Sequence, residues 1–481
     1  MNPTLVRELR EVVGERGLVT DRARLLPYES DGLALLQRPP ELVVLPRDTA
    51  ETAAVLKLLH AEGVPLVARG AGTGLSGGAT PVEGGVLVST ARMRDVLELN
   101  APDRYARVQA GLVNLQLSRA CAAHGLFYAP DPSSQGACTL GGNVAENSGG
   151  PHCFKYGSTT QHVLGLVIVT HDGEVLDLAG PAVDPVGYDL VGLFVGSEGT
   201  FGIATEITVR LVPKPEVTET LLAVFRELDG ACATVSEAIA ARLEPSALEI
   251  LDRLTIEAVE DSVFAAGYPR EAGAVLLIEA EGGEPEVAAT VAAVRALAEA
   301  HGALELRSAR DAAERARLWA GRKGAFGAMG RVAPDLYVAD AVVPRTKLQE
   351  LVGRTVEICR ERGLRLANVF HAGDGNLHPN ICYDRRDAEE TKRVLEAGEL
   401  ILKTCVAAGG SLTGEHGVGL EKLAAMEYLF TEEDLAAMAR VRAVWDPDRR
   451  LNPGKLIPMR ACMEVRTRPA VTPEASPEAK R

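Results

Sequence analysis

The chain has 481 residues, of which 46% are hydrophobic and 24% are charged, and this length and composition are typical of a globular protein with two or three domains. Its formal net charge of −15 at pH 7 argues against nucleic acid as a partner, because nothing here would neutralise a phosphate backbone. No uninterrupted apolar run approaches the roughly 20 residues that cross a bilayer, and the first residues lack the apolar core of a signal peptide. We therefore expect no transmembrane segment and a cytoplasmic location.

The cysteines are scattered along the chain, and none forms a Cys-x-x-Cys pair. They are Cys121, Cys138, Cys153, Cys232, Cys359, Cys382, Cys405 and Cys462. This spacing argues against iron–sulfur and zinc-finger ligands within the chain and is typical of reduced, mostly buried thiols. A redox enzyme built on this chain would have to pass its electrons to another molecule.

The first half of the chain is predicted to be rich in strands. Residues 41–45 read as a strand, and residues 49–62 have the apolar spacing of a helix that Asp48 or Thr49 caps. A second strand at 64–68 completes a β-α-β unit. Later strands are predicted at 85–89, 105–110, 163–170 and 207–211, and the turn His171-Asp172-Gly173 leads into a hairpin strand at 174–176.

Longer helical segments follow the proline-interrupted stretch Val212-Pro213-Lys214-Pro215. Helices are predicted at 228–242, 284–302, 345–363 and 387–408, with short strands near 220–226, 273–280, 336–343 and 365–371. This alternation predicts an α+β arrangement of one or two antiparallel sheets covered by helices. We expect an N-terminal helical segment (1–38), two domains with a boundary near 215 (39–215 and 216–460), and a disordered tail (461–481).

A glycine-rich loop follows the strand predicted at 64–68. It contains the pattern G-x-G-x-x-G at Gly72, Gly74 and Gly77. In a Rossmann fold this turn opens a helix whose N-terminus binds a pyrophosphate, but Ala79-Thr80-Pro81-Val82-Glu83-Gly84-Gly85 cannot form that helix. We expect instead a loop whose backbone N–H groups surround phosphate oxygens, where side chains would be in the way.

Two further loops are rich in glycine and small polar residues. One runs from Asp131 to Gly150, and the other runs from Gly196 to Ile203. Three such loops are more than a mononucleotide needs. They suit an extended dinucleotide that lies along the domain.

Two motifs late in the chain set histidines among glycines, namely His371-Ala372-Gly373-Asp374-Gly375-Asn376-Leu377-His378 and Gly414-Glu415-His416-Gly417. Apolar residues before the first motif predict a strand, and its centre predicts a turn, so that His371 faces His378 across a hairpin and the two can share a metal. Glu415 would complete a two-histidine, one-carboxylate set with open positions, as in catalytic metal sites, and His416 beside it is a candidate base. The alternative is an ordinary hairpin with a pair of surface histidines.

In this order, the motifs resemble those of flavoproteins of the vanillyl-alcohol oxidase type, also called the para-cresol methylhydroxylase (PCMH) type. Within that superfamily, residues from about 40 to 457 are similar to the FAD-linked subunit of glycolate oxidases and to D-lactate and D-2-hydroxyglutarate dehydrogenases. The resemblance is carried by Arg69-Gly70 with its glycine run, Gly141-Gly142-Asn143, Gly196-Ser197-Glu198-Gly199-Thr200, the two histidine motifs and Leu451-Asn452-Pro453-Gly454-Lys455. It implies a PCMH-type FAD-binding domain followed by an α+β, ferredoxin-like substrate or cap domain with a helical C-terminal part.

The resemblance also implies the cofactor and its contacts. Some members of the superfamily bind FAD covalently through a histidine in the first glycine loop, but this chain has no histidine between His60 and His124, so we expect noncovalent FAD. The expected cofactor-binding residues are Arg69, Gly70, Gly72, Thr73, Gly74, Leu75, Ser76, Gly77, Gly78, Pro132, Ser133, Thr139, Gly142, Asn143, Asn147, Glu198, Gly199, Ile203 and Asn452.

By the same resemblance, His371, His378 and Glu415 match the family's metal ligands, and His416 matches its catalytic base. A divalent zinc, iron or manganese ion suits this ligand set. Arg322 matches the arginine that grips the substrate carboxylate, for which a guanidinium is a bidentate partner; the alternative is a solvated charge on a helix. Asn380 matches an asparagine near the substrate. For Lys323, a solvent-facing position is favoured over a second carboxylate contact.

The implied function is FAD-dependent oxidation of a small 2-hydroxy acid, glycolate or D-lactate, to the 2-oxo acid. Electrons would pass to a second flavin-type subunit and an iron–sulfur subunit, or to a quinone or cytochrome, and such subunits would place the protein at the periphery of the inner membrane. The alternatives are a D-2-hydroxyglutarate dehydrogenase, an alkyl-transferring flavoenzyme of the same fold, and a flavin-binding scaffold subunit without chemistry of its own.

Overall fold

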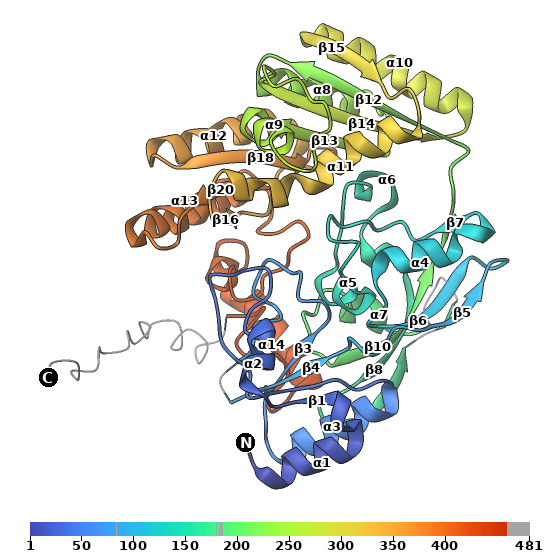
Figure 1. Cartoon of the computed structure of the whole chain (residues 1–481), viewed down its shortest axis with the longest axis vertical. Coiled ribbons are helices and arrows are strands. Elements are labelled where there is room, and N and C mark those ends of the chain that lie inside the picture. Colours follow the sequence, from blue (N-terminus) through green and yellow to red (C-terminus); the bar gives the residue numbers. More distant parts are fainter. Residues whose placement is uncertain (83, 179, 182–185, 459–481) are drawn as a thin grey trace, which may run out of the picture.

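The computed structural model describes residues 1–82, 84–178, 180–181 and 186–458. In Figure 1 the elements up to β11 fill the lower part of the molecule, and those from β12 to α13 fill the upper part. Within the described residues, no helix combines the length and apolar character needed to cross a membrane. The tail predicted at 461–481 lies outside the described residues.

The first sheet of the lower part contains the predicted β-α-β unit. Its strand order is β1 (Leu18–Val19), β2 (Leu42–Val44), β4 (Val86–Ser89), β3 (Leu66–Arg69). Helix α3 (Thr49–Ala61) connects β2 to β3, and both strands run parallel to β4, which lies between them. The carboxylate of Asp48 caps α3 by accepting a hydrogen bond from the backbone N–H of Glu51 at 2.8 Å, as predicted.

A second, antiparallel sheet completes the lower part. Its order is β5 (Val96–Asn100), β6 (Tyr105–Gln109), β10 (Ile203–Arg210), β8 (Val163–Val169), β9 (Val175–Leu178), and β7 (Leu126–Phe127) pairs with β11 (Val212–Pro213) beside it. Strand β8 has an almost wholly apolar sequence because α3 packs against it. Strand β10 begins at Ile203, earlier than predicted, because the third glycine loop runs straight into it. The helices of this part are α1 (Pro3–Val13), α2 (Arg22–Leu25), α4 (Asn114–Cys121), α5 (Leu140–Glu146), α6 (Cys153–Tyr156) and α7 (Leu190–Phe194).

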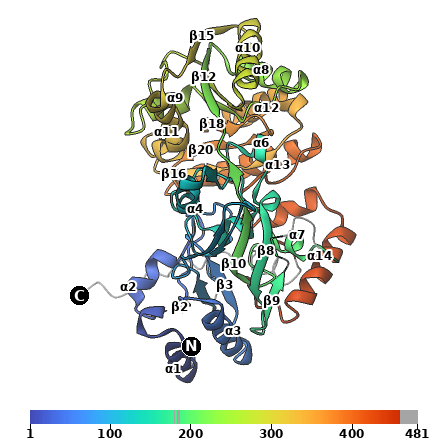
Figure 2. The ribbon, with the colours of Figure 1, turned by 90° about the vertical axis from the view of Figure 1, so that its right-hand side faces the viewer.

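One large sheet forms the centre of the upper part (Figure 2), and its described strand pairs are all antiparallel. The main order is β15 (Ala303–Ser308), β12 (Val217–Phe225), β14 (Ala274–Gly282), β13 (Ala247–Asp252), β18 (Arg365–His371), β19 (Asn376–Leu377), β17 (Ala341–Val342), and β20 (Pro379–Tyr383) pairs with both β18 and β16 (Asp335–Val338). The elements β12, α8, β13, β14, α10 and β15 have the strand order of a ferredoxin-like unit, with one additional helix between β13 and β14.

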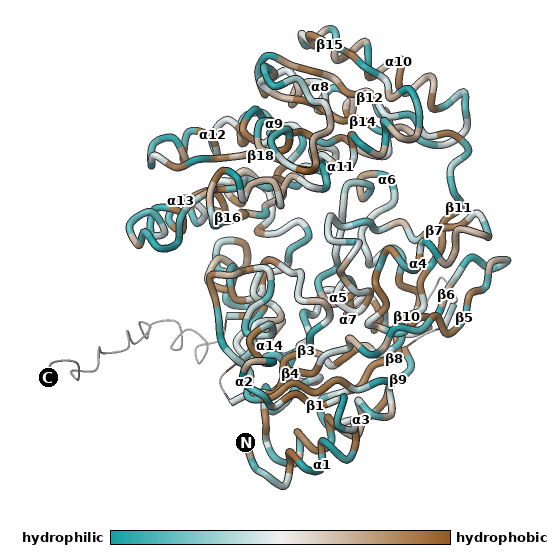
Figure 3. Tube along the Cα trace, in the orientation of Figure 1, coloured by the Kyte–Doolittle hydropathy of each residue, from teal (hydrophilic) through white to brown (hydrophobic). Residues whose placement is uncertain are grey.

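Alternate residues of the central strands face two different helical layers. Leu221 and Ala223 pack with α8 (Leu228–Ala240), α10 (Glu284–Ala300), α12 (Leu348–Glu361) and α13 (Ala388–Ala407). Leu222 and Val224 pack with α9 (Arg253–Glu260) and α11 (Ala312–Ala328) on the other face. In Figure 3 the strands are largely brown, whereas outer turns of α13 are teal. The four predicted helices are present, and α11 was not among them.

The C-terminal segment returns to the lower part of the molecule. Helix α14 (Glu432–Trp445) lies there in Figures 1 and 2, and Trp445 stacks on Phe201 with ring centroids 5.4 Å apart. Leu451 lies beside Leu66 as an extra parallel bridge at the edge of the first sheet. The C-terminal segment therefore contacts both parts: Trp445 and Leu451 pack on the predicted flavin domain, whereas Leu435, Met438 and Leu456 pack against the core of the upper part. The limits 39–215 and 216–460 stay predictions.

Candidate active site

A cavity of about 400 Å³ is lined by residues of both parts of the molecule. Most of the predicted cofactor-binding residues line it: Arg69, Gly70, Gly72, Thr73, Gly74, Leu75, Gly78, Pro132, Ser133, Thr139, Gly142, Asn143, Glu198, Gly199, Ile203 and Asn452. Three do not, namely Ser76, Gly77 and Asn147, of which Asn147 ends α5 in a left-handed conformation. His378, Glu415 and His416 line the same cavity.

The first glycine loop runs along the cavity wall without forming a helix, as predicted. Arg69, at the start of the loop, donates hydrogen bonds from its guanidinium to the carbonyl of Ser30 at 2.7 Å and to that of Ala79 at 3.5 Å, and so links the two ends of the loop. Gly72 has a φ of +72°, and a Cβ there would lie 2.2 Å from that guanidinium. A side chain at this position would be strained by the backbone conformation and would displace the Arg69 guanidinium.

The other two glycine loops are tied to neighbouring segments. In the second loop, the Thr139 hydroxyl caps α5 by accepting from the N–H of Gly142 at 3.3 Å. In the third, Glu198 accepts from the N–H groups of Val418 at 2.7 Å and Gly419 at 2.8 Å. The Asn452 amide donates to the carbonyl of Glu198 at 2.6 Å and to that of Gly78 at 3.0 Å, and so joins the first and third loops.

The residues of this cavity fit a dinucleotide. Thr90 Oγ1, Glu146 Oε2 and Asn452 Oδ1 are buried side-chain atoms on its wall without a hydrogen-bond partner, and such atoms normally find one. The glycine loops present backbone instead of side chains. The unpartnered side-chain atoms and the exposed backbone of the glycine loops would suit an extended ligand that carries many hydrogen-bond donors and acceptors, as a dinucleotide does.

The predicted hairpin is present, with a different register. Strand β18 pairs His371 with Asn376, not with His378. The predicted register is therefore wrong by two residues, because Ala372 to Gly375 form a tight turn. A shift of two keeps side chains on the same face, and the rings of His371 and His378 still lie with centroids 5.2 Å apart.

Glu415 joins the two histidines. Its Oε1 lies 3.1 Å from His371 Nε2 and 3.4 Å from His378 Nε2. Both histidines are buried, which rules out the surface-pair interpretation, and neither ring nitrogen of His378 has a hydrogen-bond partner. The convergence of three potential ligand atoms with unsatisfied nitrogens fits a divalent metal.

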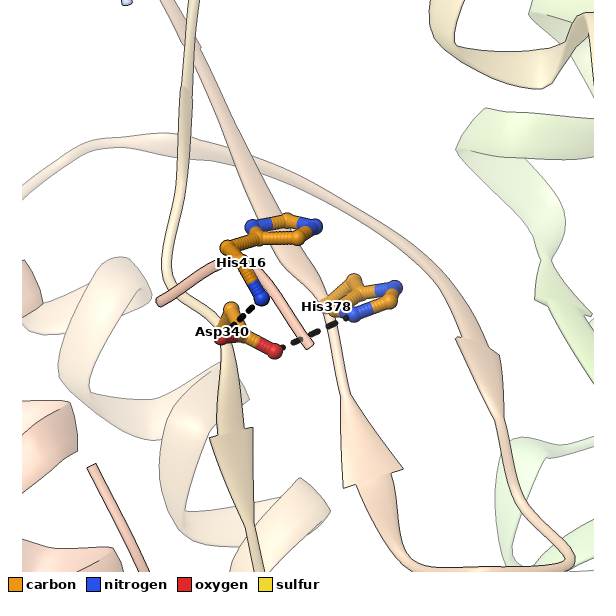
Figure 4. A group of neighbouring side chains, drawn as sticks. All are labelled: Asp340, His378 and His416. Carbon is orange, nitrogen blue, oxygen red and sulfur yellow. Dashed lines mark hydrogen bonds and ion pairs between the residues drawn. The ribbon is translucent and has the colours of Figure 1, made fainter. Parts of the chain in front are cut away.

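A second group of possible ligands shares His378. Figure 4 shows it with Asp340 and His416. The Asp340 carboxylate is already satisfied: it pairs with Lys422 at 2.8 Å and accepts hydrogen bonds from Thr413 and from the backbone N–H groups of residues 414–416. Asp340 therefore anchors the loop that carries Glu415 and His416, and the set with Glu415 fits a metal better.

Arg322 lies fully buried on α11 and not in solvent. Glu249 on β13 accepts from its Nε and Nη2 at 2.6 Å, and the other Glu249 oxygen lies 2.8 Å from His371 Nδ1. Burial alone would lower the pKa of His371, but the carboxylates of Glu249 and Glu415 raise it to about 10. Glu249 therefore orients both the predicted carboxylate-binding arginine and a predicted metal ligand.

His416 stacks on His378, with ring centroids 4.9 Å apart and 15° between the planes. Burial lowers the pKa of His416 to about 4, so the imidazole is neutral at pH 7, and its Nδ1 has no partner. Asn380 does not line the cavity, and its amide donates to the carbonyl of His378 at 2.6 Å. The sequence favoured a solvent-facing position for Lys323. In the structure Lys323 lines the cavity and pairs with Asp131 at 3.1 Å.

Sequence reasoning missed Glu249, Asp340 and Glu146. Glu249 and Asp340 are single acidic residues on or beside a strand, outside any motif, whereas Glu146 lies within the second glycine loop but was not assigned a role there. An acidic residue within the apolar strand Ala247-Leu248-Glu249-Ile250-Leu251 is the one signal that pointed to a buried partner.

A cavity lined by three glycine loops and bordered by a buried histidine–carboxylate cluster is the arrangement expected of a redox flavoprotein. Residues 40–179 match the family model described as "FAD binding domain", and residues 214–456 match "FAD linked oxidases, C-terminal domain". The chain belongs to this family of FAD-linked oxidases.

Similar proteins agree with this assignment. The chain is 46% identical over 462 residues to "Glycolate oxidase subunit GlcD" of Escherichia coli (strain K12), which covers 96% of this chain and 92% of that protein. It is 32% identical to "D-lactate dehydrogenase" of Anaerostipes hadrus, over 95% of this chain and 98% of that protein. The crystal structure of p-cresol methylhydroxylase with substrate bound has the same fold, with a TM-score of 0.80, 16% identity and coverage of 94% and 96%. The predicted family resemblance, the PCMH-type α+β fold and the FAD-binding domain are thus confirmed.

Proposed function

We propose that the protein is an FAD-dependent dehydrogenase that oxidises a small 2-hydroxy acid, glycolate or D-lactate, to the 2-oxo acid. The observation that carries this proposal is that the neutral His416 and the His378–Glu415 pair line the same cavity as the three glycine loops. The names of the similar proteins support the substrate class. FAD binds noncovalently, because the histidines on the described cavity wall belong to the catalytic cluster.

His371, His378 and Glu415 would hold a divalent zinc, iron or manganese ion. A metal at this position would polarise the substrate hydroxyl and lower its pKa. Ligation requires His371 to lose the proton that Glu249 and Glu415 favour in the metal-free protein, and the Nδ1 hydrogen bond to Glu249 leaves Nε2 directed at Glu415.

The chain's own residues bind and orient the substrate and move one proton. Arg322 is fully buried and is not among the residues that line the cavity, but its Nη1 has no hydrogen-bond partner, and this atom is proposed to bind the substrate carboxylate. His416, through its neutral ring, takes the hydroxyl proton as general base. Bound FAD supplies the acceptor for the hydride from the α-carbon, so that two electrons and two protons leave the hydroxy acid. The predicted place of Asn380 near the substrate stays a prediction; its hydrogen bond to the His378 carbonyl supports a role in positioning that ligand.

A small monocarboxylate fits the charges of the cavity better than 2-hydroxyglutarate. The permanent cations among the described cavity-lining residues are Arg69 and Lys323. Both are engaged, Arg69 with backbone carbonyls and Lys323 with Asp131. A second carboxylate would therefore enter without an uncommitted cation, which is costly for a buried charge.

Electrons are proposed to leave the flavin for a separate acceptor, because no cysteine cluster lies within the sequence. A second flavin-type subunit with an iron–sulfur subunit, a quinone or a cytochrome would serve, with the protein on the cytoplasmic side of the inner membrane. The scaffold alternative does not account for the buried cluster around Glu415. Buried imidazole nitrogens without hydrogen-bond partners destabilise a fold, and a subunit without chemistry has no need of them.

The test is anaerobic flavin reduction by glycolate, D-lactate, L-lactate and D-2-hydroxyglutarate, each with and without a chelator. Bleaching of the flavin absorption by glycolate or D-lactate that is lost on chelation is the expected result. Bound flavin that none of the acids reduces would refute the proposal and favour the scaffold or alkyl-transfer function. Reduction that survives chelation would refute the metal.

A further inference from the structure

Glu146 is a cavity residue for which the proposed chemistry gives no role. It is the last residue of α5, and its carboxyl lies where three segments meet. A Cβ on Gly78 of the first glycine loop would lie 2.7 Å from Oε1, and a Cβ on Gly417 would lie 2.3 Å from Oε2. Glu146 itself lines the cavity. Its carboxyl therefore fills a place that two glycines keep open.

This carboxyl has no hydrogen-bond partner among the described residues, and its Oε2 is fully buried. Neighbouring cations are committed elsewhere. The Lys422 ammonium binds the Asp340 carboxylate at 2.8 Å, and the Lys455 ammonium donates to the Gly78 and Thr80 carbonyls. An ionised carboxylate in such a place would lack the donors it requires.

The neighbouring acids also disfavour a negative charge. Burial, followed by the charges of Glu198 and Asp31, raises the pKa of Glu146 well above its usual range. The Glu198 carboxylate accepts hydrogen bonds from two backbone N–H groups, which are therefore not donors to Glu146. The missing donors and the neighbouring carboxylates both favour the protonated form of Glu146, and a protonated carboxyl offers one O–H donor.

The position of Glu146 identifies which end of FAD it faces. Gly417 follows His416, and the His416 ring lines the cavity. Hydride transfer requires the substrate carbon to lie between the base and the flavin ring. Glu146 is thus at the ring end of the cavity, where flavin nitrogens and carbonyl oxygens are hydrogen-bond acceptors.

We propose that Glu146 is a positioning residue that donates a hydrogen bond from its neutral carboxyl to an acceptor atom of the flavin ring, and thereby favours the reduced cofactor. The proposal rests on FAD binding with the ring beside His416, and it does not depend on which acid is oxidised. It can therefore fail while the proposed dehydrogenase activity stands, and the reverse also holds.

The test compares the midpoint potential of bound FAD in the wild type, Glu146→Gln and Glu146→Leu holoenzymes, by reduction against reference dyes without substrate. The amide of Glu146→Gln keeps a donor, so its potential stays within twofold of the wild-type equilibrium. Loss of the donor in Glu146→Leu shifts the equilibrium about tenfold toward oxidised flavin, or about 30 mV more negative for two electrons. A more positive potential in both variants would mean that Glu146 is an anion, and a wild-type value in Glu146→Leu would mean that it does not contact the ring; either result overturns the proposal.

A second measurement uses the unmodified protein, in case Glu146→Leu does not retain FAD. Infrared difference spectra between reduced and oxidised holoenzyme should contain the carbonyl band of a protonated carboxyl that shifts on reduction. The band should disappear in Glu146→Gln, which preserves shape. Its absence from the wild-type spectrum, or its persistence in Glu146→Gln, would overturn the proposal. Glu427→Gln, a change on the protein surface, controls for handling.

Discussion

Glu249 offers the sharpest test of how the site is organised. One oxygen binds the Arg322 guanidinium and the other faces His371 Nδ1 at 2.8 Å, with Glu249 and Arg322 fully buried. Glu249→Gln keeps the shape but turns one acceptor into an N–H₂ donor. With its carbonyl kept on Arg322, the amide donates to Nδ1 and moves the His371 proton to Nε2, the atom predicted to bind the metal.

Two effects of different size should follow from this substitution. Removing one charge of a buried ion pair costs roughly 3 kcal/mol of unfolding free energy, which lowers the melting temperature. Reversing the outer hydrogen bond of a ligating histidine lowers metal affinity about 10- to 100-fold, or about 1.4 to 2.7 kcal/mol. The loss of unfolding free energy should appear in the metal-free protein, whereas the loss of affinity appears only when metal is titrated.

The assay is titration of the metal-free protein with zinc or manganese against a competing chelator, with thermal unfolding of the same samples. Glu279→Gln is the matched control. Glu279 is also a buried strand carboxylate; it accepts from Trp319 at 2.5 Å and pairs with His152 at 3.0 Å, but no described contact joins it to His371, His378 or His416. It should lose stability and keep metal affinity. Equal metal affinities in wild type and Glu249→Gln would refute the orienting role of Glu249.

Three further outcomes are expected. Arg322→Lys keeps the charge but loses the planar fork, so KM for the hydroxy acid should rise about tenfold or more with a smaller change in kcat; steady-state kinetics with an unchanged KM would contradict substrate binding by this residue. Gly417→Ala forces a side chain into φ +82° and against the Glu146 carboxyl, so FAD content and melting temperature should fall more than in Gly302→Ala, which has φ +81° and open space; equal losses would mean that backbone strain alone is responsible. His152 lies between two carboxylates at 2.9 and 3.0 Å, which outweigh burial and raise its pKa from 6.5 to about 10. Folding thus takes up a proton there, and the stabilisation is fully present below pH 6.5 and lost as the pH rises to about 10. The deficit of His152→Asn, roughly 3 kcal/mol at low pH, should therefore shrink across that range in thermal unfolding, and a constant deficit would argue against a charged His152.

Local sequence signals were sufficient where one segment determines the geometry. Asp48 caps its helix as predicted, and Pro81 with the two glycines at 84 and 85 excludes the Rossmann helix. The histidine hairpin was predicted with the correct face but the wrong register, because turn length cannot be read from glycines alone. Because side chains alternate along a strand, an error of two residues leaves His371 and His378 on the same face of the hairpin, and their proximity was predicted correctly.

Contacts between distant segments were beyond reach of the sequence pattern. Glu249 and His371 are separated by 122 positions, and only the pairing of β13 with β18 brings them together. Strand β13 was itself missed, since a charged residue in its centre breaks the apolar pattern of a buried strand. The role of Asp340 was also missed because its hydrogen-bond partners lie far away in the sequence, in the loop 413–416.

The return of the C-terminal segment affects how the protein is made. Asn452 and Lys455 hold the first and third glycine loops together through Gly78 and the Glu198 carbonyl, yet they follow the whole upper part in the chain. A ribosome has finished the FAD-binding loops long before it makes the residues that fasten them. Cofactor loading should therefore occur late in biosynthesis, after the upper part has folded, and a fragment that ends at residue 430 should be unable to retain FAD.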